Sequence, residues 1–320
     1  MDIIFQNGEF LSADSSFLQE ITTAAIGAAL GAGGAIFVYW LQIQRDKDIK
    51  IFNEYKQSKA DTEYFQLVLN DAVKFIESQI LILTDYANKI IKQPYESHIL
   101  NSYPTIPLFR LEKISHEKMH HIFLSFQDNN ATKTIHDIYK YIDFYSESFK
   151  NINDQTDRDI KEVHVLKTEY VKLFADLADE FSKKANKIKY QTYNGNSIYK
   201  LDRLFTLIDK VTLDFYDSRS NTTDLTYHQN EFVRPLVEGI IQGGHLNDSD
   251  CINLAISSKS TTHKFTDIAF KNKNLGEFIH QYCNALSNNI EFFKSSIEKI
   301  SIKEPEFINK WYHFLYKPGQ

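Results

Sequence analysis

The chain has 320 residues, of which 42% are hydrophobic and 24% are charged, and its formal net charge is −6 at pH 7. This composition is typical of a globular protein and lacks the strongly basic field that nucleic-acid-binding proteins use. Its two cysteines, Cys251 and Cys283, are far apart in the sequence, which argues against a cysteine zinc site and against a disulfide scaffold. We expect both thiols to pack between helices in a reducing compartment.

The first predicted element is a transmembrane helix over residues 21–42. No charged side chain occurs in the 21 residues from Ile21 to Leu41, and about 20 apolar residues are enough to cross a bilayer. Tyr39 and Trp40, near the end of this run, suit the membrane interface. A secretory signal peptide is excluded because no positive charge precedes the run, whereas a buried core helix stays open as an alternative.

Charge sets the expected orientation of this helix. The residues before it carry only acidic charges, whereas Arg45, Lys47 and Lys50 follow it. Positive charge accumulates on the cytoplasmic side of membrane proteins. We therefore expect a short extracytoplasmic segment, residues 1–20, then a single pass through the inner membrane of a bacterium, with the bulk of the chain in the cytoplasm.

Small residues gather on one face of the expected span. Gly27, Gly31 and Gly34 fall on neighbouring turns, and ten of the twelve residues from Ala24 to Ala35 are glycine or alanine. Small side chains let a second membrane helix approach closely. The pattern predicts a homo-oligomer held through the transmembrane helix, and a loosely hydrophobic anchor is the plainer interpretation.

A long amphipathic helix is expected to continue the span over residues 42–91. Apolar side chains recur there every three or four positions, and neither glycine nor proline occurs between Gln42 and Gln93. Three prolines within residues 93–107 end it. Further helices are predicted over residues 116–126, with Ser115 as the cap, over 131–152, and from about 157 to 188.

The segment TYNGNS, residues 192–197, is typical of a turn. It separates an N-terminal cytoplasmic helical bundle, residues 43–191, from a C-terminal helical domain, residues 198–320. Strand alternation persists nowhere, so the expected fold is all-α: a single transmembrane helix continuing into a cytoplasmic multi-helix bundle. Helices of the C-terminal domain are predicted over residues 198–216, 224–241, 275–302 and 306–316.

The sharpest match to a chemical motif is HEKMH, residues 116–120. In H-E-x-x-H on a helix, two histidines one turn apart bind zinc, and the glutamate activates the metal-bound water. His116 and His120 are the candidate ligands and Glu117 the candidate base. Lys118 puts a cation inside the motif, and no third ligand is identifiable. A polar helix start with histidines on its surface is the plainer interpretation.

A second candidate is RDIKEVH, residues 158–164, which resembles the R-x(4–6)-H motif of the all-α HEPN ribonucleases. The resemblance implies that Arg158 stabilises charge and His164 does acid–base chemistry on RNA, with two copies of the motif paired across a dimer. The motif is short, and a second match runs from Arg110 to His116. RNA is an expected partner only under this interpretation.

The span, the long amphipathic helix and the segment IHDIYKYIDFYSESF, residues 135–149, together resemble phage abortive-infection proteins of the AbiC type, which are membrane-anchored helical proteins of bacteria. The resemblance covers about residues 42–181. The chain departs from that family in having one expected span where two are common. The resemblance implies a role in anti-phage defence and transfers no residue roles.

Three classes of function stay open. The leading expectation is a membrane-anchored component of bacterial anti-phage defence, an effector or sensor that oligomerises through its span. The first alternative is a non-catalytic scaffold that tethers a cytoplasmic protein partner to the lipid bilayer. The second is an enzyme, either an HEPN-type RNase or an HExxH zinc peptidase. Apart from zinc in that last case, no cofactor is expected.

Overall fold

The computed structural model describes residues 15–101, 106–126, 131–193, 196–199, 203–217, 224–303 and 305. This part of the chain is helical apart from one two-stranded hairpin, and it has one long apolar helix near the N-terminus. The expectation of an all-helical protein with such a helix is confirmed. The helix predicted over residues 306–316 and most of the predicted extracytoplasmic segment lie outside the described residues.

The chain divides into two compact units, and each is built from segments that are far apart in the sequence. Unit 1 contains residues 1–64, 118–132 and 301–320, and unit 2 contains residues 65–117 and 133–300. Three helices contain a boundary between the units: α1, Ser15–Lys92; α3, His116–Phe126; and α4, Ala131–Lys189. The bounds of α3 agree with the helix predicted over residues 116–126.

Contacts among α1, α3 and the segment after residue 300 hold unit 1 together. The ring of Tyr55 meets the ring of Phe126 edge-on, with 5.8 Å between their centroids. Lys118 Nζ lies 2.8 Å from a carboxylate oxygen of Asp61. The backbone N–H of Lys303 donates to the carbonyl oxygen of Phe126 at 3.0 Å. In this unit α3 therefore makes an aromatic contact and an ion pair with α1, and a backbone hydrogen bond with the segment after residue 300.

Helix α1 is continuous, so the predicted helix over residues 42–91 does extend the apolar segment without a break. Eleven of its buried residues follow one another at alternating spacings of three and four, as in coiled coils, where such a stripe faces the neighbouring helices. The members of this stripe are Tyr55, Ser58, Thr62, Phe65, Leu69, Ala72, Ile76, Gln79, Leu83, Tyr86 and Ile90.

A single helix, α4, Ala131–Lys189, replaces the two helices that were predicted on either side of residues 153–156. Its first two residues belong to unit 1 and the rest to unit 2. Thr156 and Asp159 are buried and stand on the same three-and-four spacing as their apolar neighbours. Two polar residues at consecutive buried positions weaken the apolar signal but leave the helix intact. No glycine or proline occurs between residues 131 and 189 to break the backbone.

Helix α8, Ser249–Glu298, is a second correction, because it begins far before the predicted start at residue 275. Ser258 and Thr261 are fully buried in its first half, so polar side chains again occupy core positions. Asp248 caps the helix, since its side chain accepts hydrogen bonds from the N–H groups of the second and third residues of α8. Asp is a common capping residue, but the polar residues that follow Asp248 at core positions interrupt the apolar pattern of the helix.

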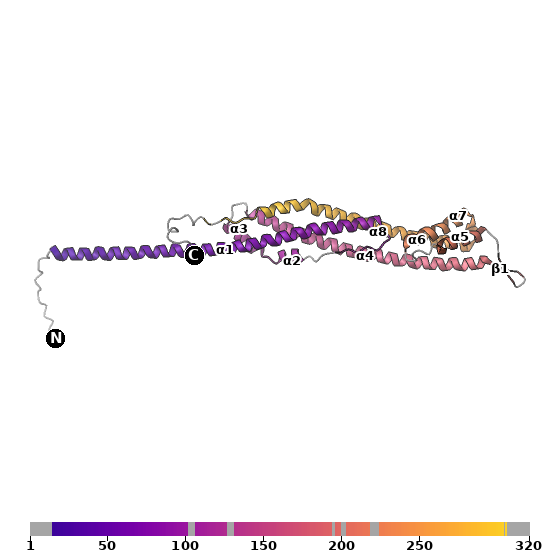
Figure 1. The fold of residues 1–320 in the computed structure, drawn as a ribbon, viewed down its shortest axis with the longest axis horizontal. Coiled ribbons are helices and arrows are strands. Elements are labelled where there is room, and N and C mark those ends of the chain that lie inside the picture. The colour runs from indigo at the N-terminus through magenta and orange to yellow at the C-terminus, as the bar shows by residue number, and fades with distance from the viewer. Residues whose placement is uncertain are drawn as a thin grey trace, which may run out of the picture. The chain divides into compact units, whose positions relative to one another are not determined.

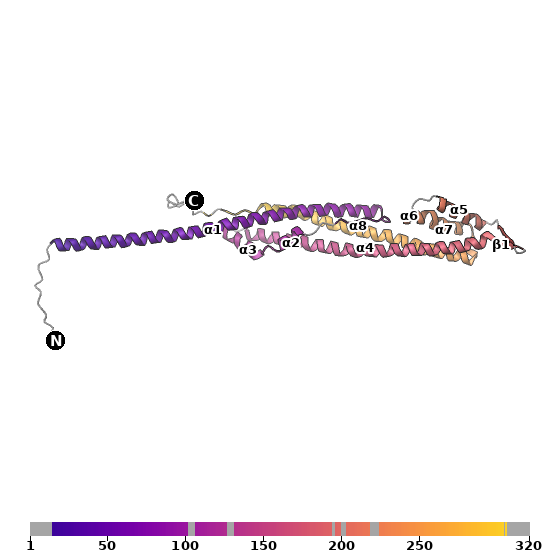
Figure 2. The same cartoon turned by 60° about the horizontal axis from the view of Figure 1, so that its bottom comes forward.

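Three long helices pack against one another in unit 2: α4, α8 and the part of α1 from residue 65 onward (Figures 1 and 2). Between α1 and α4, the rings of Phe75 and Phe149 lie 5.8 Å apart. Between α4 and α8, the hydroxyl of Tyr145 donates to the carbonyl oxygen of Leu286 at 3.1 Å. The buried stripes of the helices therefore face one another.

Helices α1 and α8 approach closely. The thiol of Cys283 donates to the carbonyl oxygen of Ile80 at 3.9 Å. A Cβ added to Gly276 would stand only 2.5 Å from Ile91 Cγ1, so glycine permits this approach. Cys283 is buried here and Cys251 is buried at the start of α8, and both are free thiols, as expected of residues that pack between helices.

Short elements pack against the C-terminal half of α4. Their shared core includes Phe181 of α4, Phe232 and Ile240. A π-helical turn precedes Pro235, which cannot donate the hydrogen bond of a regular helical turn. The short elements of unit 2 are α2, Ile106–Glu112; α5, Arg203–Asp217; α6, Leu225–His228; the π-helix η1, Gln229–Val233; α7, Arg234–Gln242; and the 3₁₀-helix η2, His245–Asn247.

An antiparallel hairpin stands where a turn was predicted over residues 192–197. Its strands are β1, Tyr190–Tyr193, and β2, Asn196–Tyr199. In the sequence, Asn-Gly lies between them, the dipeptide most favoured in two-residue hairpin turns. The two strands were not predicted, and the helix expected from residue 198 begins instead at Arg203.

Candidate functional site

The apolar side chains of α1 are uncovered along nearly all of the predicted span, up to Trp40. Every residue from Leu18 to Trp40 is exposed, and Leu30 and Ile36 are 70% and 69% exposed. By length and composition this helix is able to cross a membrane. Keeping such a surface in water is unfavourable, at about 25 cal/mol for each Å² of apolar area. A core helix of a soluble protein would instead be covered by its own chain.

The small-residue face within this segment is equally open. Nothing lies within 4 Å of the position that a Cβ would take on Gly27, Gly31 or Gly34. The polar groups at the start of the segment are satisfied locally, since the Thr23 hydroxyl donates to the carbonyl oxygen of Gln19 at 2.7 Å. The helix therefore offers an apolar surface without unpaired hydroxyl groups at its threonines.

The HEKMH histidines lie on α3, as predicted. The His116 ring meets the Tyr139 ring edge-on, with 4.5 Å between centroids. The cation inside the motif, Lys118, is engaged by Asp61. In the part of the chain that the structure describes, no group of three His, Cys, Asp or Glu side chains could hold a metal ion. Those residues therefore offer His116 and His120 no third ligand.

Arg158 and His164 lie on α4 but do not share a site within one chain. Six residues along a helix separate two side chains by about 120° around its axis. The Arg158 guanidinium turns back along its own helix, donating to the Gln155 side-chain oxygen at 2.7 Å and to the Asp154 carbonyl oxygen at 3.3 Å. His164 instead lines a hollow in unit 2 together with residues that the sequence did not single out.

We call this space the His164 hollow. It measures about 130 Å³ and is bounded by α1, the segment after α1, α4 and α8. Its polar lining includes Glu96 and His98 from the segment after α1, His164 and Lys167 from α4, and Asn272 from α8. Burial lowers the pKa of the Lys167 ammonium, although the negative charge of Glu96 acts in the opposite direction.

Two hydrogen bonds and one aromatic stack hold the segment after α1 against α4 and α8. Lys167 Nζ donates to the carbonyl oxygen of Glu96 at 2.8 Å, and the Asn272 amide donates to that of Pro94 at 2.6 Å. The ring of Tyr95 stacks on that of Phe265 with 3.8 Å between centroids. One wall of the His164 hollow is therefore held in place from two helices.

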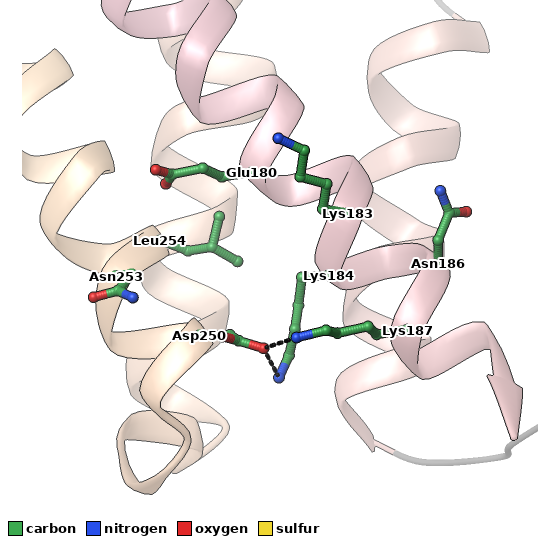
Figure 3. A pocket seen from close by; sticks show the side chains of 8 residues that line it. All are labelled: Glu180, Lys183, Lys184, Asn186, Lys187, Asp250, Asn253 and Leu254. Carbon is green, nitrogen blue, oxygen red and sulfur yellow. Dashed lines mark hydrogen bonds and ion pairs between the residues drawn. The ribbon is translucent and has the colours of Figure 1, made fainter.

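A second hollow, of about 570 Å³, lies between the end of α4 and the start of α8 (Figure 3). Asp250 reaches Lys184 Nζ at 3.4 Å and Lys187 Nζ at 3.3 Å, and Lys184 also lies 2.6 Å from Asp248. Lys183 pairs with Asp179. Each of these lysines already has a carboxylate partner, so we interpret the hollow as a structural ion-pair network that joins the two helices.

Opposite charges shift the pKa values in this network. The hydrogen bond from Lys184 is the largest of the effects that hold the pKa of the Asp248 carboxyl below its ordinary range. Burial alone would lower the pKa of Lys184, but hydrogen bonding to Asp248 and the negative charge of that residue raise it overall. The sequence contained a signal for this network, because Lys184 follows Phe181 at the same spacing as the buried residues of α4.

Comparison with known proteins finds no family model, curated protein or solved structure that matches the chain. The resemblances to abortive-infection proteins and to HEPN ribonucleases therefore stay predictions.

Proposed function

We propose that the protein is a single-pass anchor in the bacterial inner membrane, which crosses the bilayer with the start of α1 and carries a helical body on the cytoplasmic side. The observation that carries this proposal is the uncovered segment from Leu18 to Trp40. Its 23 residues rise about 34 Å as a helix, and the hydrocarbon core of a bilayer is about 30 Å thick. Lipid would cover a surface that the chain itself leaves bare.

Two further features support the same proposal. Arg45, Lys47 and Lys50 directly follow the segment, which favours a cytoplasmic location for what comes next. Gly27 and Gly31 leave room for a second helix, so we propose that copies of the chain associate through this face. In such an assembly the helical body would act as a scaffold or sensor for a cytoplasmic partner.

Membrane fractionation of matched variants tests the anchor. We expect the full-length chain to stay with membranes after a carbonate wash and to be released by detergent. Ile26→Arg with Leu30→Arg puts two charges in the span, at a cost of about 2.5–3.5 kcal/mol each, and should move most of the protein out of the membrane fraction. Leu67→Arg with Leu81→Arg is the control, because these two residues lie on α1 outside the span. Leu67 and Leu81 are 61% and 71% exposed, which matches Ile26 at 59% and Leu30 at 70%.

The anchor is supported if the Leu67→Arg, Leu81→Arg variant stays in the membrane fraction and the Ile26→Arg, Leu30→Arg variant leaves it. A wild-type chain that is recovered without detergent in the soluble fraction would contradict it.

The anti-phage role implied by the AbiC-type resemblance needs its own test. We expect bacteria that express the full-length chain to yield fewer phage plaques, and the Ile26→Arg, Leu30→Arg variant to lose this protection because it lacks the anchor. The Leu67→Arg, Leu81→Arg pair controls for expression and added charge. Equal plaque numbers with and without the wild-type chain, across a broad phage panel, would argue against defence while leaving the membrane anchor untouched.

A further inference from the structure

The His164 hollow differs from the other polar sites of unit 2 in the group that accepts the hydrogen bond of its lysine. Four lysines that are buried or half-buried, Lys184, Lys264, Lys271 and Lys294, each lie within 2.8 Å of a carboxylate oxygen. Lys167 is half-buried as well, but its hydrogen bond goes to a backbone carbonyl oxygen. Among the described residues it forms no ion pair within 4.0 Å, although Glu96 lines the same hollow.

Burying a charge is unfavourable, and burial lowers the pKa of Lys167 even though Glu96 acts in the opposite direction. A carbonyl oxygen satisfies one of the three protons of the ammonium group, and the negative charge of Glu96 offsets the cost of burial only in part. An anion in the hollow would provide the missing charge and accept a further hydrogen bond. At the four other lysines named above, a carboxylate compensates the positive charge.

Two imidazoles share the hollow with this ammonium group. His98 uses Nε2 for a hydrogen bond to the carbonyl oxygen of Gln93 at 2.8 Å, which leaves Nδ1 without that partner. The His164 ring has no hydrogen-bond or ion-pair partner among the described residues. His98 uses its one neutral-ring N–H at Nε2, so its Nδ1 is an acceptor, whereas the His164 ring offers an N–H donor. Lys167 and His164, both of α4, therefore bring donors to one small space.

Size narrows the class of ligand. Pockets for drug-sized molecules usually measure about 300–1,000 Å³. At about 130 Å³, the His164 hollow accommodates a small anion or the end of a larger ligand. A tetrahedral group with several acceptor oxygens can meet donors that arrive from different directions, and lysine is a common phosphate ligand.

We propose that the His164 hollow binds a phosphate group, with Lys167 as the charge partner and His164 as a flanking donor. The phosphate could be free, could end a small soluble molecule, or could belong to a lipid headgroup, since all three present the same oxygens. This inference does not depend on the proposed membrane anchor.

Titration of the full-length protein in neutral detergent tests the proposal. The probes are inorganic phosphate, adenosine monophosphate and sulfate, followed by calorimetry or by the unfolding temperature. We expect phosphate or the monophosphate to bind and to stabilise the protein, and Lys167→Met to weaken binding by about tenfold or more, as expected for a hydrogen bond to a charged group. Lys172→Met removes the same charge from an exposed position of α4 and should bind like the wild type.

A second variant separates binding from folding, because Lys167 also holds the segment after α1. His164 is exposed and its ring is unpaired, so His164→Gln should leave the unfolding temperature unchanged without phosphate and weaken phosphate binding several-fold. For the lipid source, the same variants are compared in phosphatidylcholine nanodiscs with and without phosphatidic acid. Stabilisation by phosphatidic acid alone that disappears in Lys167→Met would support the phosphate site and assign it to a headgroup.

Three results would overturn the proposal. One is the absence of binding to every probe, nanodiscs included. Another is equal binding in wild type, Lys167→Met and His164→Gln. The third is equal loss of binding in Lys167→Met and in the Lys172→Met control, since this would reflect net charge and not the hollow.

Discussion

Lys184 illustrates how single residues join the long helices of unit 2. Its side chain is only 8% exposed, and its ammonium group lies between Asp248, which caps α8, and Asp250. Replacing it with methionine keeps much of the side-chain volume but removes the ammonium group that donates to Asp248 Oδ2. We expect Lys184→Met to lower the free energy of unfolding by about 1–3 kcal/mol, measured by denaturant titration at pH 7.

The same variant should respond to pH in a defined way. The pKa of the Asp248 carboxyl lies below its ordinary value of 3.8 in the folded protein, so the pair stabilises the fold above that pH. This stabilisation is lost as the pH falls through the lowered pKa. The difference between wild type and Lys184→Met should therefore be full near pH 7 and shrink below about pH 4.

Lys187→Met serves as the matched control for this prediction, because Lys187 also contacts Asp250 but is 72% exposed. Exposed ion pairs contribute little, so we expect a much smaller loss of stability. Equal losses in the two variants would mean that burial of Lys184 has no particular importance.

At the scale of elements, the type of each long helix could be predicted from the sequence, but the lengths of two of them could not. Helix α1 was clear because its apolar spacing is almost unbroken and neither glycine nor proline interrupts it after the span. In α4 and α8, buried polar residues occupy core positions: Thr156 and Asp159 in one helix, Ser258 and Thr261 in the other. Some of their partners lie on other helices, as in the 2.8 Å pair between Asp159 and Lys271, and no single-helix pattern reveals such pairs.

In the candidate sites too, residues within one helix could be predicted from the sequence, whereas their neighbours from other elements could not. His164 was found from a short motif, and the motif's own partner, Arg158, does not line the same hollow. Lys167 and His98 come from elements whose proximity depends on tertiary packing. A motif within one helix can identify a side chain of interest, whereas its neighbours across helices become visible only in the fold.

The start of α1 allows a prediction about association, because its two faces differ in composition and both are exposed. We expect Gly27→Leu with Gly31→Leu to reduce chemical cross-linking of the chain in membranes, since larger side chains keep a second helix at a distance. Ala29→Leu with Gly33→Leu adds the same side chains on the opposite face. No atom lies within 4 Å of the place that a Cβ would take on Gly27, Gly31 or Gly33, so folding of the monomer should be unaffected.

Cross-linking that is lost in the first pair and kept in the second would support association through the small-residue face. A wild-type chain that cross-links no more than a monomeric membrane protein would rule out this mode of association.

At the scale of the whole molecule, the most consequential feature is that the uncovered apolar segment and the packed part of α1 belong to one helix. Neither glycine nor proline occurs between Gln42 and Gln93, so no flexible linker interrupts this helix. Under the proposed membrane anchor, the side of the membrane on which Lys50 lies is the side on which the following residues begin.

Cysteine labelling determines that side, and the chain is well suited to it. The two natural thiols, Cys251 and Cys283, are 0% and 3% exposed, and burial raises the pKa of each, so little reactive thiolate forms near neutral pH. In otherwise unchanged chains, Ser16→Cys should react with a membrane-impermeant maleimide in cells whose outer membrane has been permeabilised. Lys50→Cys, at a side chain that is 79% exposed, should react only after the inner membrane is opened. The reverse order of labelling would put the helical body outside the cytoplasm, because charge would then have failed to orient the helix.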